Sequence, residues 1–227
     1  MESGFKKQNI LTQALFQKVF FWMFVGLISS AITAQFTIAS GFINVLLNNF
    51  VLFIGLIIIE LILVVVLASR IMKMDESTAK GVFVGYALIN GVTISAILIM
   101  YTLASVVSTF IITALMFGSL ALIGFFTKKD LSGMGLFFLM ALVGLIIASI
   151  VNIFMQSSML YWAITCLGIL IFAGLTVYDT NKIKKWVEKG LINKRNINKF
   201  AIIGALSLYL DFVNMFIYML RIFGKRR

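Results

Sequence analysis

Several residue types that build enzyme active sites and metal centres are missing from this chain or nearly so. Its 227 residues contain no histidine, no proline and a single cysteine, Cys166. Without histidine, a histidine-based catalytic triad, a histidine-ligated zinc or haem and an imidazole proton shuttle are excluded. One cysteine excludes an intrachain disulfide and a multi-cysteine metal site. Because proline is absent, any break in a helix must come from glycine or from inserted polar groups.

Charged residues are also scarce, whereas hydrophobic residues are abundant. Asp, Glu, Lys and Arg make up 12% of the chain and hydrophobic residues 62%, against about 25% and roughly 45–50% in soluble globular domains. So little polar surface cannot cover a water-soluble particle. The composition therefore predicts an integral membrane protein surrounded by membrane lipid.

Seven apolar runs are each about long enough to cross ~30 Å of hydrocarbon as a helix. They are residues 19–39, 50–69, 81–103, 106–126, 136–154, 161–178 and 200–220. The first run is too long for the core of a signal peptide, so we expect it to remain as a helix. We expect one all-α membrane domain over residues 1–227, with a short N-terminal tail and a polar loop at about 180–199.

The net charge of +11 arises from basic residues that gather in alternate connections. The N-terminal tail and the second, fourth and sixth connections carry 15 of the 19 lysines and arginines, and the other connections carry none. The positive-inside rule therefore places the N-terminus in the cytoplasm, and the charge reflects orientation rather than nucleic-acid binding.

The C-terminal end conflicts with this orientation. Seven crossings place it outside, although it holds the remaining four basic residues, Arg221, Lys225, Arg226 and Arg227. Two explanations stay open. The last segment re-enters without crossing, or the other fifteen positive charges outweigh these four in setting the orientation. We expect seven crossings.

Three of the eight acidic residues fall within the apolar runs or directly at the end of one. Glu60 is in the middle of the second run, Asp211 in the middle of the last, and Asp179 at the cytoplasmic end of the sixth. A charge near the bilayer centre costs about 2.5–3.5 kcal/mol on insertion scales, so such residues face the bundle interior and commonly serve ions or protons. We expect this for Asp211. For Glu60 and Asp179, structural pairing or solvation at a helix end stays open.

Polar residues accompany Asp211 along one face of its helix. Ser207, Asp211, Asn214 and Tyr218 follow one another at spacings of four, three and four residues, which places them on one stripe. Hydrogen bonding between helices is the alternative role of such a stripe. Similar stripes on the third and fourth runs are expected to serve mainly helix packing: Tyr86, Asn90, Thr93, Ser105, Thr109 and Thr113.

Arg70 follows Glu60 by ten residues, which places it about 15 Å nearer the cytoplasm on a helix. That depth suits an ion pair with Asp179 better than one with Glu60. A role as a plain interfacial anchor is equally well supported.

Three stretches of the chain together resemble one family. Residues 205–224 are ALSLYLDFVNMFIYMLRIFG, residues 172–183 are FAGLTVYDTNKI, and residues 108–118 and 127–132 are STFIITALMFG and TKKDLS. These stretches resemble the Bax inhibitor motif family, in its bacterial branch, and the likeness covers essentially the whole chain.

The resemblance implies seven helices, of which the last is central and is surrounded by the other six. It also implies a pH-sensitive calcium leak, with Asp179 and Asp211 as a paired-carboxylate pH sensor and cation site. Arg70, within one register step, would act as a latch on Asp179. Calcium ions and protons would then be the partners, no resident cofactor would be needed, and protein partners stay unknown. The composition suggests a bacterial plasma membrane.

Elementary electrostatics suits this role. Two carboxylates that are close together in a low dielectric resist double ionisation, so the pair titrates as a unit. A calcium ion can neutralise the pair instead, because Ca²⁺ prefers oxygen ligands. The hypothesis is that protonation and Arg70 compete for Asp179, which moves the sixth helix and opens or blocks a path lined by Asp211. Other pore-lining or supporting residues would be Glu60, Ser207, Asn214 and Tyr218.

Three other functions are alternatives to a leak channel. An intramembrane aspartyl protease also carries two aspartates on late helices, but residues 208–211 are LYLD rather than Gly-x-Gly-Asp, and the Pro-Ala-Leu element needs proline. We therefore expect no enzyme. A calcium/proton antiporter uses the same pair, and the third alternative is a regulatory protein that acts through membrane partners.

Overall fold

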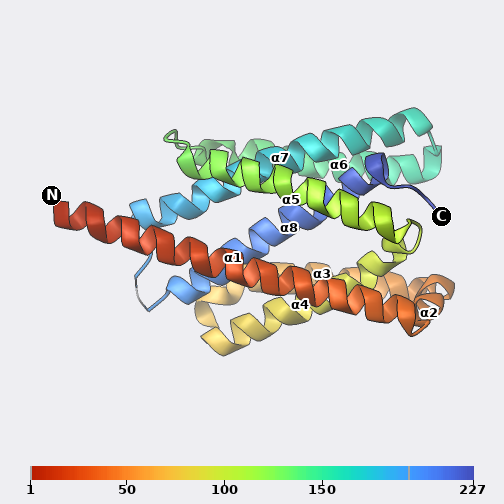
Figure 1. Ribbon diagram of the computed structural model, residues 1–227, viewed down its shortest axis with the longest axis horizontal. Coiled ribbons are helices and arrows are strands. Elements are labelled where there is room, and N and C mark those ends of the chain that lie inside the picture. The colour runs from red at the N-terminus through yellow and green to blue at the C-terminus, as the bar shows by residue number, and fades with distance from the viewer. Residues whose placement is uncertain (1, 194) are drawn as a thin grey trace. The chain divides into compact units, whose positions relative to one another are not determined.

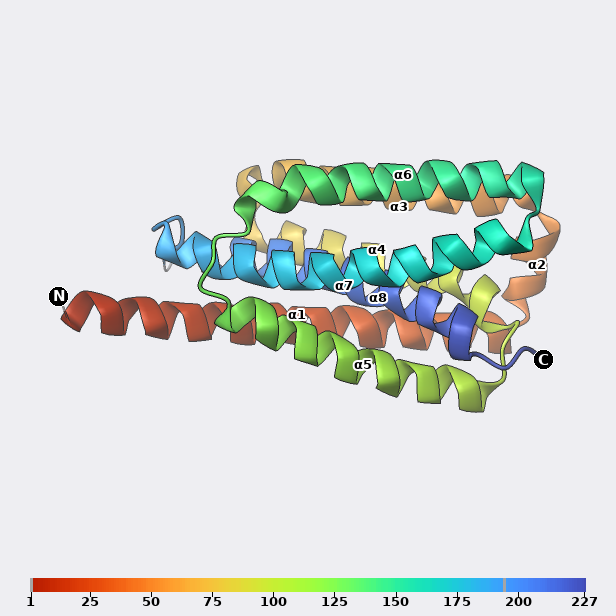
Figure 2. The same cartoon turned by 90° about the horizontal axis from the view of Figure 1, so that it is seen from above.

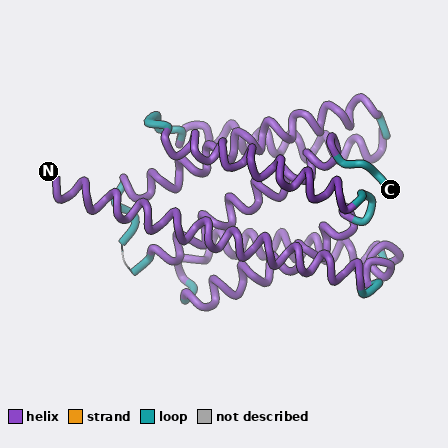
Figure 3. Tube along the Cα trace, in the orientation of Figure 1, coloured by secondary structure: helices purple, strands orange, loops and turns teal. Residues whose placement is uncertain are grey.

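The structure is a computed structural model, and it describes residues 2–193 and 195–227, with side chains from Gln8 onward. These residues form helices and no strand (Figures 1 and 3). Lys6, Lys7 and Lys194, which support the predicted orientation, have side chains outside the described part. The helices are α1 (Glu2–Ala39), α2 (Phe42–Asn48), α3 (Phe50–Arg70), α4 (Glu76–Leu98), α5 (Leu103–Phe126), α6 (Gly135–Met155), α7 (Ser158–Glu188) and α8 (Ile197–Phe223), with two short 3-10 helices, η1 (Ile71–Lys73) and η2 (Ser132–Met134).

Seven helices among the described residues, α1 and α3 to α8, are long and apolar enough to cross a membrane. The predicted all-α membrane protein with seven spans is thereby confirmed. Most helix ends lie within a few residues of the predicted runs. The third run was placed too far along the chain, because α4 spans Glu76–Leu98 and Thr102 already directly precedes α5.

The turn between α1 and α3 contains a helix that the sequence did not indicate. Gly41, between the end of α1 at Ala39 and the start of α2, has a φ of 75°, a left-handed conformation that glycine adopts without strain. The seven-residue α2 follows, and the Asn49 side chain then accepts a hydrogen bond from the Leu52 N–H and caps α3. Glycine and asparagine thus provide the break that proline often supplies elsewhere.

The chain divides into two compact units, and the first contains Met1–Tyr101, Gly190–Tyr209 and Arg226–Arg227. In this unit α1 packs against α4, and α3 packs against α4 (Figure 1). The Phe83 ring of α4 makes edge contacts with the rings of Trp22 and Tyr209, and Phe83 and Tyr209 are fully buried. Aromatic packing therefore joins α1, α4 and the first part of α8.

The second unit contains Thr102–Lys189 and Leu210–Lys225. In this unit α7 lies between α5 and α6 (Figure 2). The Phe212 ring of α8 lies 5.2 Å from the Phe110 ring and 5.5 Å from the Phe117 ring, both on α5. Gly168 of α7 lies against the Tyr218 ring, so the second part of α8 is held by α5 and by α7.

α8 contributes to both units, because its residues up to Tyr209 belong to the first and those from Leu210 to the second. In the most apolar stretch of α8, 67% of the residues are buried, compared with 6% of the residues in the corresponding stretch of α3. The predictions that α8 is central to the bundle and that residues 1–227 form a single domain concern both units together and stay predictions.

A close backbone contact in the first unit leads to a stability prediction. A Cβ atom added to Gly91 would lie 2.4 Å from the backbone oxygen of Ser30, whereas one added to Gly85 on the same helix would meet nothing within 4 Å. We expect Gly91→Ala to destabilise the protein by about 1–3 kcal/mol, because α1 and α4 must move apart. Thermal unfolding in detergent micelles measures this, with Gly85→Ala as the matched control. Equal stability of the two variants would contradict the packing described here.

Candidate functional site

Asp211 is the most deeply buried acidic residue in the membrane-spanning helices. It is 4% exposed, and its Oδ2 atom has no hydrogen-bond partner among the described residues. The hydroxyls of Thr109 and Thr180, which also belong to the second unit, are buried and without a partner in the same part of the chain. A charged carboxylate in such surroundings needs a cation or a proton.

Asp179 of α7 lies close enough to Asp211 for the charges of the two carboxylates to interact. Both residues belong to the second unit, and Asp179 is only partly buried. The structure therefore brings together the two aspartates that the family resemblance pairs. Their roles as pH sensor and cation site stay predictions.

Lys182 is a third charged residue at this site, and the sequence analysis had assigned it to the polar loop. Its charge interacts with that of Asp211, and its ammonium group lies 5.6 Å from the centre of the Tyr178 ring. Lys182 follows Asp179 by three residues, so both lie on the same side of α7. The spacing was available in the sequence, but it is informative only if the helix continues beyond Asp179.

The helix does continue, so the predicted position of Asp179 at a helix end was wrong, as was the start of the polar loop near residue 180. α7 extends through Glu188, and nine helical residues follow Asp179. Ile183 and Val187 in this extension are buried, unlike the side chains of a solvated loop. The connection to α8 is limited to residues 189–196.

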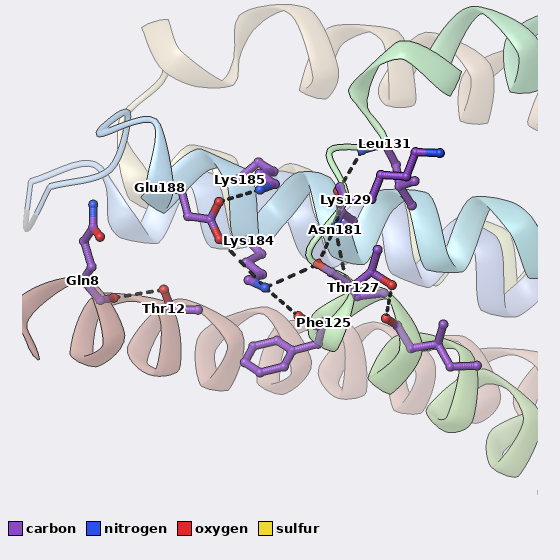
Figure 4. Close-up of polar contacts among 12 residues, drawn as sticks. Gln8, Thr12, Phe125, Thr127, Lys129, Leu131, Asn181, Lys184, Lys185 and Glu188 are labelled. Atoms are coloured by element: carbon purple, nitrogen blue, oxygen red, sulfur yellow. Dashed lines mark hydrogen bonds and ion pairs between the residues drawn. The ribbon is translucent and has the colours of Figure 1, made fainter. Parts of the chain in front are cut away.

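Asn181 joins this extension to the end of α5 (Figure 4). Its side-chain oxygen accepts a hydrogen bond from the Leu131 N–H at 3.2 Å. Its amide nitrogen lies 3.2–3.4 Å from three carbonyl oxygens, those of Gly124, Thr127 and Lys129. The last carbonyls of a helix have no partner within the helix. Gly124 belongs to the last turn of α5, and Thr127 and Lys129 follow the helix. The two N–H groups of the Asn181 amide serve these acceptors, two residues after Asp179.

Lys184 strengthens the same connection. Its ammonium group donates to the Phe125 carbonyl at 2.9 Å and lies 3.8 Å from a Glu188 carboxylate oxygen (Figure 4). A lysine at the carbonyl end of α5 also interacts favourably with the helix dipole. The extension of α7 is therefore helical because the end of α5 supplies acceptors for its polar side chains.

The polar stripe of α8 makes packing contacts in the structure. Asn214 donates to the Leu210 carbonyl of its own helix at 2.8 Å, and the Tyr218 ring stacks on the Phe172 ring at 6.0 Å. Ser207 is half-buried and belongs to the first unit. These contacts fit supporting roles. That Ser207, Asn214 and Tyr218 line the ion path beside Asp211 stays a prediction.

Glu60 and Arg70 belong to the first unit, whereas the aspartate pair belongs to the second. Glu60 accepts hydrogen bonds from the Thr93 hydroxyl at 2.5 Å and from the Asn90 amide at 3.4 Å. Arg70 is the last residue of α3 and is exposed. The proposed latch between Arg70 and Asp179 therefore stays a prediction.

The described residues contain no cluster of three or more Asp, Glu, Cys or His side chains that could hold a metal ion. A cation at the Asp179–Asp211 pair would thus have carboxylates from α7 and α8, and its other ligands would be neutral oxygens. Ca²⁺ accepts such mixed oxygen ligands.

Comparison with known proteins shows extensive similarity. A family model described as inhibitor of apoptosis-promoting Bax1 matches residues 12–227. The inner membrane protein YbhL of Escherichia coli strain K12 is 45% identical over 219 residues, which cover 95% of this chain and 93% of YbhL. An uncharacterized protein of Borreliella burgdorferi is 41% identical over 225 residues, 98% of this chain and 97% of the relative. An uncharacterized protein of Deinococcus radiodurans is 38% identical over 209 residues, which cover 92% of this chain and 89% of the relative.

The connection between α5 and α7 leads to a second stability prediction. Asn181→Ala should lower the free energy of unfolding by about 1–3 kcal/mol, because it leaves buried backbone groups at the end of α5 unsatisfied. Chemical denaturation in detergent measures this loss. Ser119→Ala, at an exposed position of α5 whose hydroxyl contacts only the Leu115 carbonyl of its own helix, is the control and should change stability by less than about 0.5 kcal/mol. Similar small effects of both changes would contradict the role given to Asn181.

Proposed function

Since this chain belongs to the Bax inhibitor family, we propose that it conducts calcium ions passively across a membrane and that protons control this leak. The similarity to an inner membrane protein favours the plasma membrane of a bacterium. The distribution of basic residues favours a cytoplasmic N-terminus. On this proposal the protein is not an enzyme, and calcium is its cargo.

The observation that carries the proposal is the environment of Asp211. Its carboxylate is 4% exposed, has one oxygen without a hydrogen-bond partner in the described chain, and interacts with the charge of Asp179. Two negative charges in a sheltered site repel each other, and neutral donors do not compensate them. A proton shared by the pair, or a divalent cation between them, removes the repulsion. Protons and calcium therefore compete for one site.

The position of Lys182 and the α5–α7 connection link this competition to movement. When the pair is ionised, it attracts Lys182. In the predicted latch it also attracts Arg70. When the pair binds a proton, this attraction weakens. The part of α7 that carries Asp179 is held to α5 by Asn181 and Lys184 through hydrogen bonds to carbonyl groups, which do not depend on the charge of the pair. We infer that α7 pivots at this connection when the pair changes its charge.

Calcium flux into proteoliposomes, measured from about pH 5 to pH 8, tests the role of the pair. When the uptake of one proton switches a protein between a conducting and a non-conducting state, the ratio of the two populations changes by up to about tenfold per pH unit. The wild-type flux should therefore vary strongly with pH. Asp179→Asn and Asp211→Asn should each remove this variation, because the amide takes up no proton in this range. Retention of the wild-type pH dependence by both variants would refute the proposal.

Asp130→Asn is a matched control for loss of one carboxylate outside the membrane. Hydrogen bonds from the Ser132 side chain and backbone, with the charge of Lys189, lower the pKa of Asp130 to about 2. Because this pKa is depressed on folding, the stabilisation is present at pH values above the ordinary aspartate pKa and is lost only as the pH falls toward 2. Asp130 is thus ionised throughout the assay, and its replacement should leave the pH dependence of the flux unchanged.

The direction of transport distinguishes a leak from an exchanger that uses the same pair. A proton gradient is imposed on vesicles with a known calcium gradient. Calcium should move only down its own gradient. Movement of calcium against its gradient would contradict a leak and identify an antiporter. A correctly folded, reconstituted protein without any flux would instead favour a regulatory protein that acts through partners.

A further inference from the structure

Polar side chains from four helices meet in the first unit and form one hydrogen-bonded chain. We call these residues the Glu60 network: Glu60 of α3, Asn90 and Thr93 of α4, Tyr209 of α8 and Ser30 of α1. The four neutral members are at most 8% exposed, and Glu60 is half-buried at the middle of α3. The network belongs to the first unit and shares no residue with the aspartate pair.

Asn90 sets the direction of the chain. Its amide nitrogen lies 3.4 Å from Glu60 Oε2, and its amide oxygen accepts a hydrogen bond from the Tyr209 hydroxyl at 2.7 Å. The Tyr209 oxygen also lies 2.6 Å from the Ser30 hydroxyl, which in turn lies 2.8 Å from the Ala87 carbonyl oxygen. Glu60 is thus connected through one amide to a fully buried tyrosine of α8.

No positive charge compensates Glu60 in the described residues, where none of the ion pairs includes it. The titratable groups whose charges interact with Glu60 are Tyr86 of α4 and Tyr209 of α8. A carboxylate at mid-membrane depth among neutral groups needs a proton or a cation. Ca²⁺ requires six to eight oxygen ligands, whereas the oxygens here already hydrogen-bond to one another. A proton is therefore the ligand that fits.

Thr93 suits both charge states of Glu60. Its hydroxyl oxygen lies 2.5 Å from Glu60 Oε1 and 3.0 Å from the backbone carbonyl oxygen of Asn90. When Glu60 is ionised, the hydroxyl donates to the carboxylate. When Glu60 holds a proton, the carboxyl donates to the hydroxyl oxygen, and the hydroxyl hydrogen turns to the carbonyl. Because hydrogen bonds are made in both states, the proton can bind and leave without stranding a buried polar group.

We propose that Glu60 is a second proton-binding site, separate from the Asp179–Asp211 pair, and that Asn90 relays its charge to Tyr209. Loss of the proton draws the Asn90 amide nitrogen toward the carboxylate. Polarisation of the amide then makes its oxygen a better acceptor for the Tyr209 hydroxyl, as in other chains of hydrogen bonds in a low dielectric. The assignment requires no calcium flux and stands whether or not the protein is a leak channel.

Infrared difference spectra of the full-length protein in phospholipid vesicles, recorded between acid and neutral pH, test this assignment. The wild type should show the C=O stretching band of a protonated carboxyl group that changes with pH. Glu60→Gln should remove one such band and leave those of the other carboxyl groups, whereas Asp211→Asn, which removes the other carboxyl group deep in the membrane, should retain the band that Glu60→Gln removes. A spectrum of Glu60→Gln that equals that of the wild type would overturn the proposal.

The relay has its own readout in the same spectra. The C–O stretching band of Tyr209 is identified as the tyrosine signal that is missing in the spectrum of Tyr209→Phe. In the wild type this band should shift over the same pH range in which the Glu60 band changes. Asn90→Leu, of similar size, should retain the carboxyl band and lose the shift of Tyr209. A shift that survives this substitution would refute the relay but not the proton site. Because no calcium is present, failure here is distinct from failure of the flux experiment.

Discussion

A carboxylate inside the hydrocarbon of a membrane has no water to stabilise its charge, and this constraint governs both candidate sites. At Asp211 a second carboxylate lies within electrostatic range, so the two negative charges repel each other unless a proton or a cation binds. At Glu60 the neighbours are neutral donors, arranged so that either charge state has hydrogen bonds. Each arrangement couples the charge of a side chain to the helices around it.

α8 carries part of both environments. Tyr209, which ends the Glu60 network, precedes Asp211 by two residues on this one helix. Bulky aromatic rings and glycines hold its neighbours in place: Phe212 contacts two phenylalanines of α5, and Tyr218 lies against Gly168 of α7. A helix that is packed so closely responds to a charge change by discrete shifts rather than by gradual deformation.

The polar extension of α7 shows where reasoning from sequence fails. Asn181 and Lys184 lie in a stretch whose lysines and asparagine resemble those of a loop, and hydropathy alone ended the helix near Tyr178. The stretch is helical because the end of α5 offers carbonyl groups to these two side chains, a contact between segments more than 50 residues apart. For the same reason Lys182 was not recognised as a neighbour of Asp211, and Tyr209 was not recognised as a partner of Asn90.

Amino-acid composition and hydropathy were sufficient to establish an integral membrane protein with seven helices and to single out Glu60, Asp179 and Asp211 as exceptions. These are properties of single segments, because lipid imposes the same demand on every spanning helix wherever its neighbours lie. The tertiary structure decided which polar groups meet. The rotation of each helix and the close approach allowed by Gly91, Gly124 and Gly168 set those meetings, and both depend on side chains that are distant in the sequence.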